Sequence, residues 1–302
     1  MKKRLMTAIA VGAAALVALS GCSSSGSGGD TVKNGDKKDL TINVFSGWAE
    51  DITASYLWKG ILEDKGYDVK LETTTAGPGF TGVSKGDYDM NFDAWLPSTH
   101  KNYWAKYGDK LEKLGVWYKD APLTIAVNKD APIDSLDQLA SHAKDFNNTI
   151  VGIEPGAGET GVVQDDVIPA YGLKNMKFET SSTAAMLAAL KKATKDGDNI
   201  AVTLWKPHWA YSAFPIKDLK DPKGALGKGD SITAFGRTGF TKDYPQLSKW
   251  LKKFSFPDKE LFQLEDQLFN PGTGSAPDES EYPDIVKKWM SSHKDFVDSL
   301  TS

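Results

Sequence analysis

Three tryptophans occupy the same kind of position, directly after a predicted strand. Trp48 follows TINVFSG, Trp95 follows YDMNFDA, and Trp205 follows NIAVTL. Ligands of open α/β sheets bind beyond the carboxyl ends of the strands, so we expect the three indoles to line one cleft. Their faces suit a cation that cannot donate hydrogen bonds. Quaternary ammonium is the usual example, at about 2 kcal/mol or more per desolvated contact.

A glycine-rich turn, EPGAGET from Glu154 to Thr160, joins a predicted strand to a predicted helix. Such turns direct backbone N–H groups at the cleft, where the helix dipole favours an anion. The turn is not a phosphate loop, because the Walker lysine and the spaced dinucleotide glycines are missing. His100, just past Trp95, either donates to the same anion or caps the chain locally. The combination predicts a ligand with a cation at one end and a small anion at the other.

Alternating strands and helices must position these residues. Strands are predicted at residues 40–45, 67–71, 88–94, 123–127, 149–153, 200–204 and 231–235, and helices at 57–62, from 158 onward and at 186–193. This alternation favours an α/β fold with mostly parallel sheets. Two crossings between two lobes, near 122–128 and 231–238, fit the layout. Such a protein closes on its ligand by a hinge motion.

The N-terminus predicts export. Residues 1–4 are basic, and Ala8 to Leu19 is an apolar run that is shorter than the roughly 20 residues of a membrane span. Residues 1–21 are therefore interpreted as a signal peptide. The run ends at Cys22, the only cysteine, and resembles a bacterial lipoprotein lipobox, which implies a lipid anchor on Cys22. The alternative is an ordinary secretory signal with a chance cysteine.

Residues 22–39 are predicted to form a lipidated flexible tether, because they consist of serine, glycine and charged residues with little to bury. Removal of Lys2, Lys3 and Arg4 with the signal peptide takes the formal net charge from −4 to −7. That charge argues against a nucleic-acid partner. With one cysteine, the chain has no disulfides and no thiol chemistry.

Other functions find little support. A hydrolase with His100 or His208 as base lacks a G-x-S-x-G nucleophile and an obvious carboxylate pair. The four histidines show no metal-ligand spacing, so no metal and no cofactor is expected. An amino-acid-binding protein of the same fold predicts an arginine for the carboxylate, but Arg237 is the only arginine beyond Arg4.

From about residue 40 to 289 the chain resembles the substrate-binding lipoproteins of glycine betaine/proline betaine ABC transporters. The resemblance rests on three motifs: W-L-P-x-T-H from Trp95 to His100, W-x-P-H-W from Trp205 to Trp209, and G-I-x-P-G-x-G from Gly152 to Gly158. It implies a two-lobed periplasmic-binding-protein type II fold with a two-strand hinge. Lobe 1 is expected at 40–124 plus 233–302 and lobe 2 at 125–232.

The resemblance also implies how the site works. Trp48, Trp95 and Trp205 form a cage around a trimethylammonium group. Backbone amides at Gly158 and Glu159, with the side chain of His100, bind the carboxylate. The partners are a betaine ligand, an ABC permease with its ATPase, and the outer face of the membrane through the lipid anchor.

One residue departs from the family pattern. Glu159 stands where relatives carry an apolar residue. If its side chain points outward, it is harmless. If it points inward, it repels a carboxylate and favours a ligand such as choline. Carnitine and sulfonium analogues also remain open.

Overall fold

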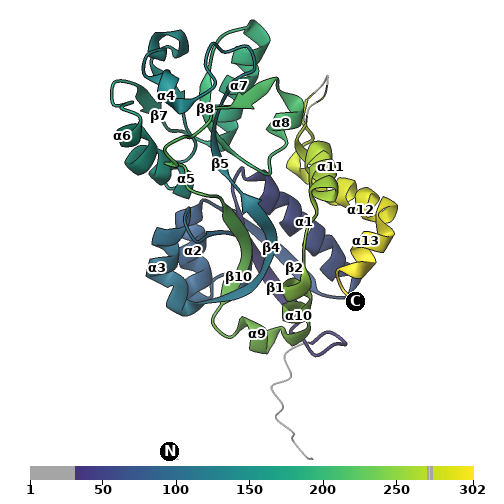
Figure 1. Ribbon diagram of the computed structural model, residues 1–302. Coiled ribbons are helices and arrows are strands. Elements are labelled where there is room, and N and C mark those ends of the chain that lie inside the picture. Colours follow the sequence, from purple (N-terminus) through teal and green to yellow (C-terminus); the bar gives the residue numbers. More distant parts are fainter. Residues whose placement is uncertain (1–30, 271, 273–274) are drawn as a thin grey trace, which may run out of the picture.

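The computed structural model describes residues 31–270, 272 and 275–302 as two α/β lobes, one above the other in Figure 1. Each lobe is built around a five-stranded sheet. Lobe 1 holds the sheet ordered β2-β1-β3-β10-β4, and lobe 2 holds the sheet ordered β7-β6-β8-β5-β9. The strands are β1 Asp39–Phe45, β2 Asp68–Thr74, β3 Met90–Leu96, β4 Leu111–Ala121, β5 Leu123–Asn128, β6 Thr149–Val151, β7 Lys177–Glu179, β8 Ala201–Trp205, β9 Ile216–Asp218 and β10 Asp230–Arg237.

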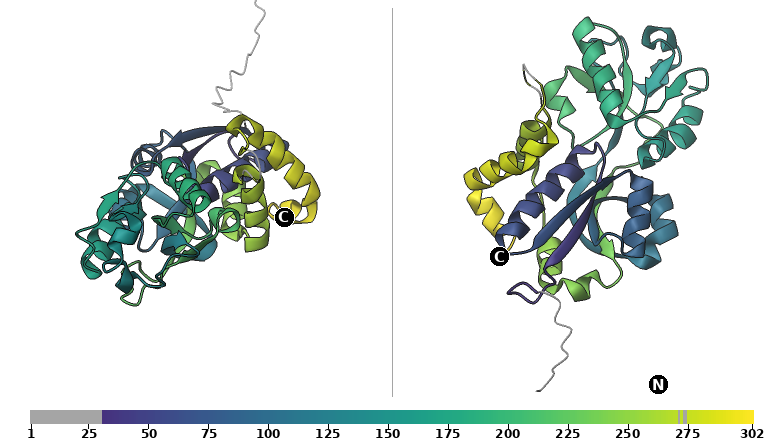
Figure 2. Two further views of the ribbon diagram at one scale, coloured as in Figure 1. Left: turned by 90° about the horizontal axis from the view of Figure 1, so that it is seen from above. Right: turned by 180° about the vertical axis from the view of Figure 1, so that it is seen from behind.

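Helices cover both sheets. They are α1 Ala49–Asp64, α2 Ala76–Lys85, α3 Lys101–Tyr107, α4 Leu136–Leu139, α5 Gly158–Val162, α6 Ile168–Ala170, α7 Thr183–Asp196, α8 Ala210–Ala213, α9 Phe240–Asp243, α10 Pro245–Lys253, α11 Asp258–Phe269, α12 Tyr282–Ser292 and α13 Lys294–Ser299. A π-helical turn, Val163–Val167, joins α5 to α6. In the rear view of Figure 2, α1 lies between the sheet of lobe 1 and the C-terminal helices.

Local sequence explains two elements that matter for the site. All seven residues of β3, MNFDAWL, are buried, as expected for a central strand that is covered on both faces. Helix α7 begins after Ser182, whose hydroxyl accepts from the Ala185 N–H at 3.1 Å, and ends at Gly197 in the left-handed conformation. Both ends therefore carry the caps that a helix prefers.

The predicted two-lobed α/β architecture is confirmed, but the sheets are mixed. In each sheet two pairings are parallel and two are antiparallel. The difference arises at the crossings, because β10 returns from lobe 2 and enters its sheet antiparallel to β3 and β4. The parallel β2-β1-β3 and β7-β6-β8 portions are the parts that alternation of strands and helices could predict.

The two crossings between the lobes lie side by side. The chain leaves lobe 1 at Pro122, between β4 and β5, and returns at Asp230, which pairs with Ala121. Sheet membership thus moves the expected lobe limits by a few residues, because Leu123 already pairs with Trp205 in lobe 2 and Asp230 already belongs to lobe 1.

Part of the segment that the sequence predicts to be a flexible tether is folded. The predicted signal peptide and Cys22 lie outside the described residues. Within the described part, Asp36 is fully buried and accepts hydrogen bonds from the Tyr67 hydroxyl at 2.7 Å and from the Gln246 and Leu247 N–H groups at 2.8 and 2.9 Å. Residues 31–38 therefore belong to the folded lobe. Its glycine and charged residues predict a segment that cannot pack, yet the buried Asp36 carboxyl and the pairing of Lys37 with Asp243 hold it to the lobe.

Within the described ranges, no helix has the length and apolar character that crossing a membrane requires.

Candidate ligand-binding site

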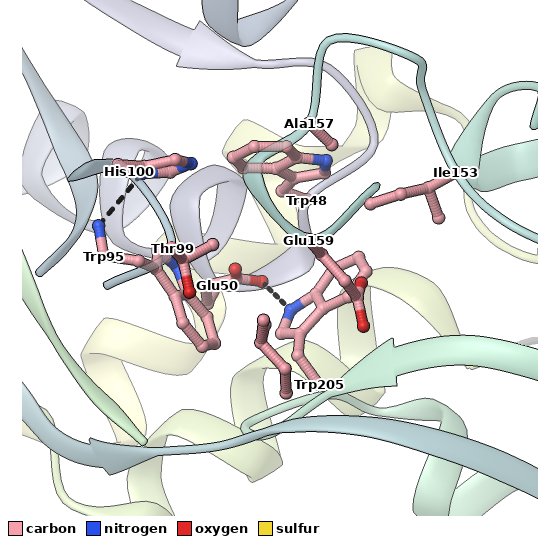
Figure 3. A pocket seen from close by; sticks show the side chains of 10 residues that line it. Trp48, Glu50, Trp95, Thr99, His100, Ile153, Ala157, Glu159 and Trp205 are labelled. Atoms are coloured by element: carbon pink, nitrogen blue, oxygen red, sulfur yellow. Dashed lines mark hydrogen bonds between the residues drawn. The ribbon is translucent and has the colours of Figure 1, made fainter. Parts of the chain in front are cut away.

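A pocket lies between the lobes, beyond the carboxyl ends of β1, β3 and β8 (Figure 3). About 250 Å³ of space, part of it open to solvent, is left between the lining atoms. Both lobes contribute to its wall, as expected for a site that closes between them. The lining residues are Trp48, Glu50, Trp95, Thr99, His100, Leu123, Ile153, Ala157, Glu159 and Trp205.

The structure brings the three strand-end tryptophans together in this pocket, and we call them the tryptophan cage. Trp48 precedes α1, Trp95 lies near the end of β3, and Trp205 is the last residue of β8. All three are at most 6% exposed. The rings of Trp48 and Trp205, from opposite lobes, have centroids 6.3 Å apart at 63°.

Each cage indole donates its N–H to an acidic side chain. Trp205 Nε1 donates to Glu50 Oε2 at 2.9 Å (Figure 3), and Trp95 Nε1 donates to Asp93 Oδ1 at 2.8 Å. Trp48 Nε1 donates to Glu154 Oε2 over a longer 3.5 Å. The polar edge of each ring is thereby satisfied, and the ring faces supply the apolar, electron-rich surface of the pocket.

His100 presents a neutral donor to the pocket. Its Nδ1 accepts the Trp95 backbone N–H at 3.0 Å, which places the ring proton on Nε2. Nε2 is buried and has no hydrogen-bond partner among the described residues. Burial lowers the pKa of His100 to about 4, so the ring is uncharged at neutral pH. It stacks on Trp48, with centroids 5.6 Å apart at 10°.

Gly158 opens α5 next to His100, on the opposite side of the cleft. A Cβ at this position would lie 2.4 Å from the Thr99 carbonyl oxygen and 2.9 Å from His100 Cδ2. Only glycine lets the lobes approach this closely. The first N–H groups of a helix have no partner within the helix, so the amides at Gly158 and Glu159 are donors at this point.

The Glu159 side chain points into the pocket. Its side chain lines the pocket beside Trp205 (Figure 3), and the residue is 3% exposed. Neither carboxyl oxygen has a hydrogen-bond partner within the described residues. Burial, reinforced by the nearby Glu50 carboxyl, raises the pKa of Glu159 well above its usual range. The buried surroundings therefore favour the neutral form of this carboxyl.

Sequence reasoning missed Glu50. It is 1% exposed, lines the pocket, and burial raises its pKa to about 8. Its neighbours Asp51 and Asp93 are also fully buried, and burial raises the pKa of Asp51 to about 7 and that of Asp93 well above normal. An acidic residue in the first turn of a helix commonly complements the helix dipole, so Glu50 gave no distinct signal.

His208 supports the cage from behind. Its Nδ1 accepts the Ala210 N–H at 3.0 Å, and its ring meets the Trp205 ring edge-on with centroids 4.9 Å apart. It does not line the pocket. In the described part of the chain, no group of three or more histidine, cysteine or acidic side chains converges as metal ligands do.

Two α/β lobes that meet over an aromatic pocket define a two-lobed ligand-binding protein of the periplasmic-binding-protein kind. The family described as the substrate-binding domain of ABC-type glycine betaine transport systems matches residues 38–292. The chain belongs to this family, as the three motifs predicted.

The chain is also similar to individual solved structures and known proteins. The chain is 30% identical to lactococcal OpuAC in its closed form with glycine betaine, with a TM-score of 0.79 over 88% of this chain and 100% of that one. Against the Borrelia burgdorferi glycine/betaine/L-proline-binding protein ProX it has 26% identity and a TM-score of 0.79, covering 88% and 97% of the two chains. The Listeria monocytogenes glycine betaine/carnitine transport binding protein GbuC is 34% identical over 57% of this chain, and the match spans 54% of that protein's length.

Proposed function

We propose that the protein captures a quaternary-ammonium osmolyte, glycine betaine or proline betaine, and delivers it to an ABC importer. One observation carries the proposal: indoles from both lobes line one small pocket beside a neutral imidazole donor. The cage would hold the trimethylammonium group. His100 Nε2 and the amides at Gly158 and Glu159 would hold the carboxylate.

The energetics suffice for capture at micromolar concentrations. A dissociation constant of 1 μM corresponds to about −8 kcal/mol. Cation–π contacts contribute about 2 kcal/mol each when desolvated, and three rings are in place. Hydrogen bonds to the charged carboxylate add about 1.5–3 kcal/mol each. The sum leaves room for the cost of immobilising the ligand.

The buried Glu159 does not oppose this assignment. A protonated carboxyl carries no charge that repels the ligand's carboxylate, and its O–H can donate to it. The proteins described as binding glycine betaine, at 30% and 34% identity, point to the same ligand. Choline, carnitine and a sulfonium analogue are the competing ligands in the test below.

The remaining proposals concern the cell. Cys22, as the lipidated N-terminus, would anchor the protein to the extracytoplasmic face of the membrane, with the permease and its ATPase as partners. The protein would bind and release its ligand without chemical turnover. Its acidic charge fits a function that involves no nucleic acid.

Titration of intrinsic tryptophan fluorescence against glycine betaine, proline betaine, choline, carnitine, dimethylsulfoniopropionate and free amino acids tests the class of ligand. We expect a spectral change with betaines and none with amino acids. In calorimetry, Trp205→Ala should weaken glycine betaine binding more than tenfold, because it removes one wall of the cage. Unchanged binding by this variant contradicts the cage.

A further inference from the structure

Two of the three indole–carboxyl hydrogen bonds of the tryptophan cage cross between the lobes, and they cross in opposite directions. Trp205 of lobe 2 donates to Glu50 of lobe 1, while Trp48 of lobe 1 donates to Glu154 of lobe 2. The third, from Trp95 to Asp93, stays inside β3 of lobe 1. Trp48 and Trp205 are thus each hydrogen-bonded to the lobe opposite their own.

The Glu50 bond is the tighter of the two. Glu50 lies in the first turn of α1, and its Oε2 is 2.9 Å from Trp205 Nε1 (Figure 3). Both residues are at most 3% exposed, so water does not compete for the bond. A hydrogen bond in such surroundings is stronger than one at the surface.

The Glu154 bond is longer but its acceptor is rigidly held. Glu154 Oε1 accepts the Thr183 N–H at 2.8 Å, and its Oε2 accepts the Thr183 hydroxyl at 2.9 Å. Thr183 is the first residue of α7, so the carboxylate is fixed to the start of a 14-residue helix. At 3.5 Å, Trp48 Nε1 adds the weaker contact from the other lobe.

Other bonds across the cleft leave the cage untouched. The Tyr103 hydroxyl donates to the Gly156 carbonyl at 2.7 Å at the exposed rim, and Ser212 Oγ donates to Asp266 Oδ1 at 3.1 Å between α8 and α11. Among the hydrogen bonds of the described residues, only those to Glu50 and Glu154 join a cage ring to the opposite lobe.

We propose that Glu50 and Glu154 are positioning residues that form two reciprocal latches, each of which locks a cage tryptophan to the opposite lobe when the protein closes. Opening the cleft breaks both bonds and frees both rings, so closure and assembly of the cage become one event. The latches prolong the closed state and slow ligand release. This proposal rests on the proposed function only in taking a betaine as the ligand.

A double-mutant cycle tests the main latch. Glu50→Ala and Trp205→Phe each remove the bond, the second while keeping an aromatic ring. Each should raise the glycine betaine dissociation rate about fivefold, measured by stopped-flow tryptophan fluorescence. The double variant should release glycine betaine no faster than the faster of the two single variants, because both substitutions remove the same hydrogen bond. Glu50→Gln, whose amide oxygen still accepts from the indole, should restore the rate. Glu154→Ala should give a smaller increase, about twofold.

A second readout needs no ligand. The exposed residues Asp109 in lobe 1 and Lys174 in lobe 2 serve as dye sites, as Asp109→Cys and Lys174→Cys in a Cys22→Ala background. Single-molecule energy transfer between the two dyes then reports the fraction of closed molecules. Glu50→Ala and Trp205→Phe should lower that fraction, whereas Trp95→Phe, which loses an indole bond inside one lobe, should not.

Independent effects of Glu50→Ala and Trp205→Phe, with the double variant showing their product, overturn the latch. An unchanged closed fraction in both does so as well. If the protein bound no betaine at all, the proposed function would fail, and the ligand-free closed fraction would still decide the latch.

Discussion

Gly158→Ala should prevent full closure of the lobes. The added Cβ would lie 2.4 Å from the Thr99 carbonyl oxygen, and this oxygen belongs to the backbone and cannot rotate away. Carbon–oxygen contacts are comfortable only from about 3.3 Å, so the lobes must stay about 0.9 Å further apart at this point. That opening weakens the Trp205–Glu50 and Tyr103–Gly156 bonds, which are 2.9 and 2.7 Å long.

At about 1 kcal/mol for each lost bond, Gly158→Ala should weaken glycine betaine binding about thirtyfold. Gly161→Ala is the matched control on the same helix, because a Cβ there meets no atom within 4 Å. Calorimetry should show a large loss for the first variant and a change of less than about twofold for the second. Thermal unfolding should leave Gly158→Ala as stable as the control, because the clash exists only between lobes. Equal affinities in the two variants refute the closed geometry.

Three further outcomes follow from the site. His100→Ala removes the free Nε2 donor, so calorimetry should show glycine betaine binding roughly tenfold or more weaker and choline, which has no carboxylate, little affected; equal losses for both ligands contradict the assigned role. Glu159→Gln keeps the shape of a neutral carboxyl, so affinity at pH 7 should change less than about threefold, and a large gain in affinity would mean that Glu159 is ionised. Burial raises the pKa of Glu50 to about 8 and that of Asp51 to about 7. In the folded state these carboxyls therefore stay protonated at pH values where the same carboxyls in the unfolded chain have ionised. Between about pH 7 and 8, where the opposing contributions of His100 and His208 fade, urea denaturation should therefore show the free energy of unfolding falling with pH, by about 1.4 kcal/mol per unit for each carboxyl still protonated; rising stability contradicts the raised values.

The sequence located the cage because strand ends are easy to recognise and converge in an α/β sheet. That rule predicts that Trp48, Trp95 and Trp205 converge, and the fold places them around one pocket. The motifs then supplied His100 and Gly158. The close approach of Gly158 to Thr99 depends on how the lobes meet, which no local pattern encodes.

The burial of individual charged residues could not be predicted from the sequence. Asp36 and Glu50 are charged residue types in ordinary surroundings, a polar segment and a helix start, yet they are 0% and 1% exposed. The contacts that bury them come from residues about 155–210 positions away, Trp205 for Glu50 and Gln246 with Leu247 for Asp36. Patterns within a short window cannot report such contacts. The mixed sheets escaped prediction for the same reason, since β10 pairs with strands more than 100 residues earlier.

A calorimetric titration with glycine, dimethylglycine and glycine betaine tests the central claim most directly. The three ligands share a carboxylate and differ only in the number of methyl groups on nitrogen. A cage of indole faces should bind glycine betaine with micromolar affinity, dimethylglycine more weakly, and glycine without measurable heat, because N–H groups lose their hydrogen bonds to water against indole faces. Glycine binding as tightly as glycine betaine would contradict a tryptophan cage for quaternary ammonium.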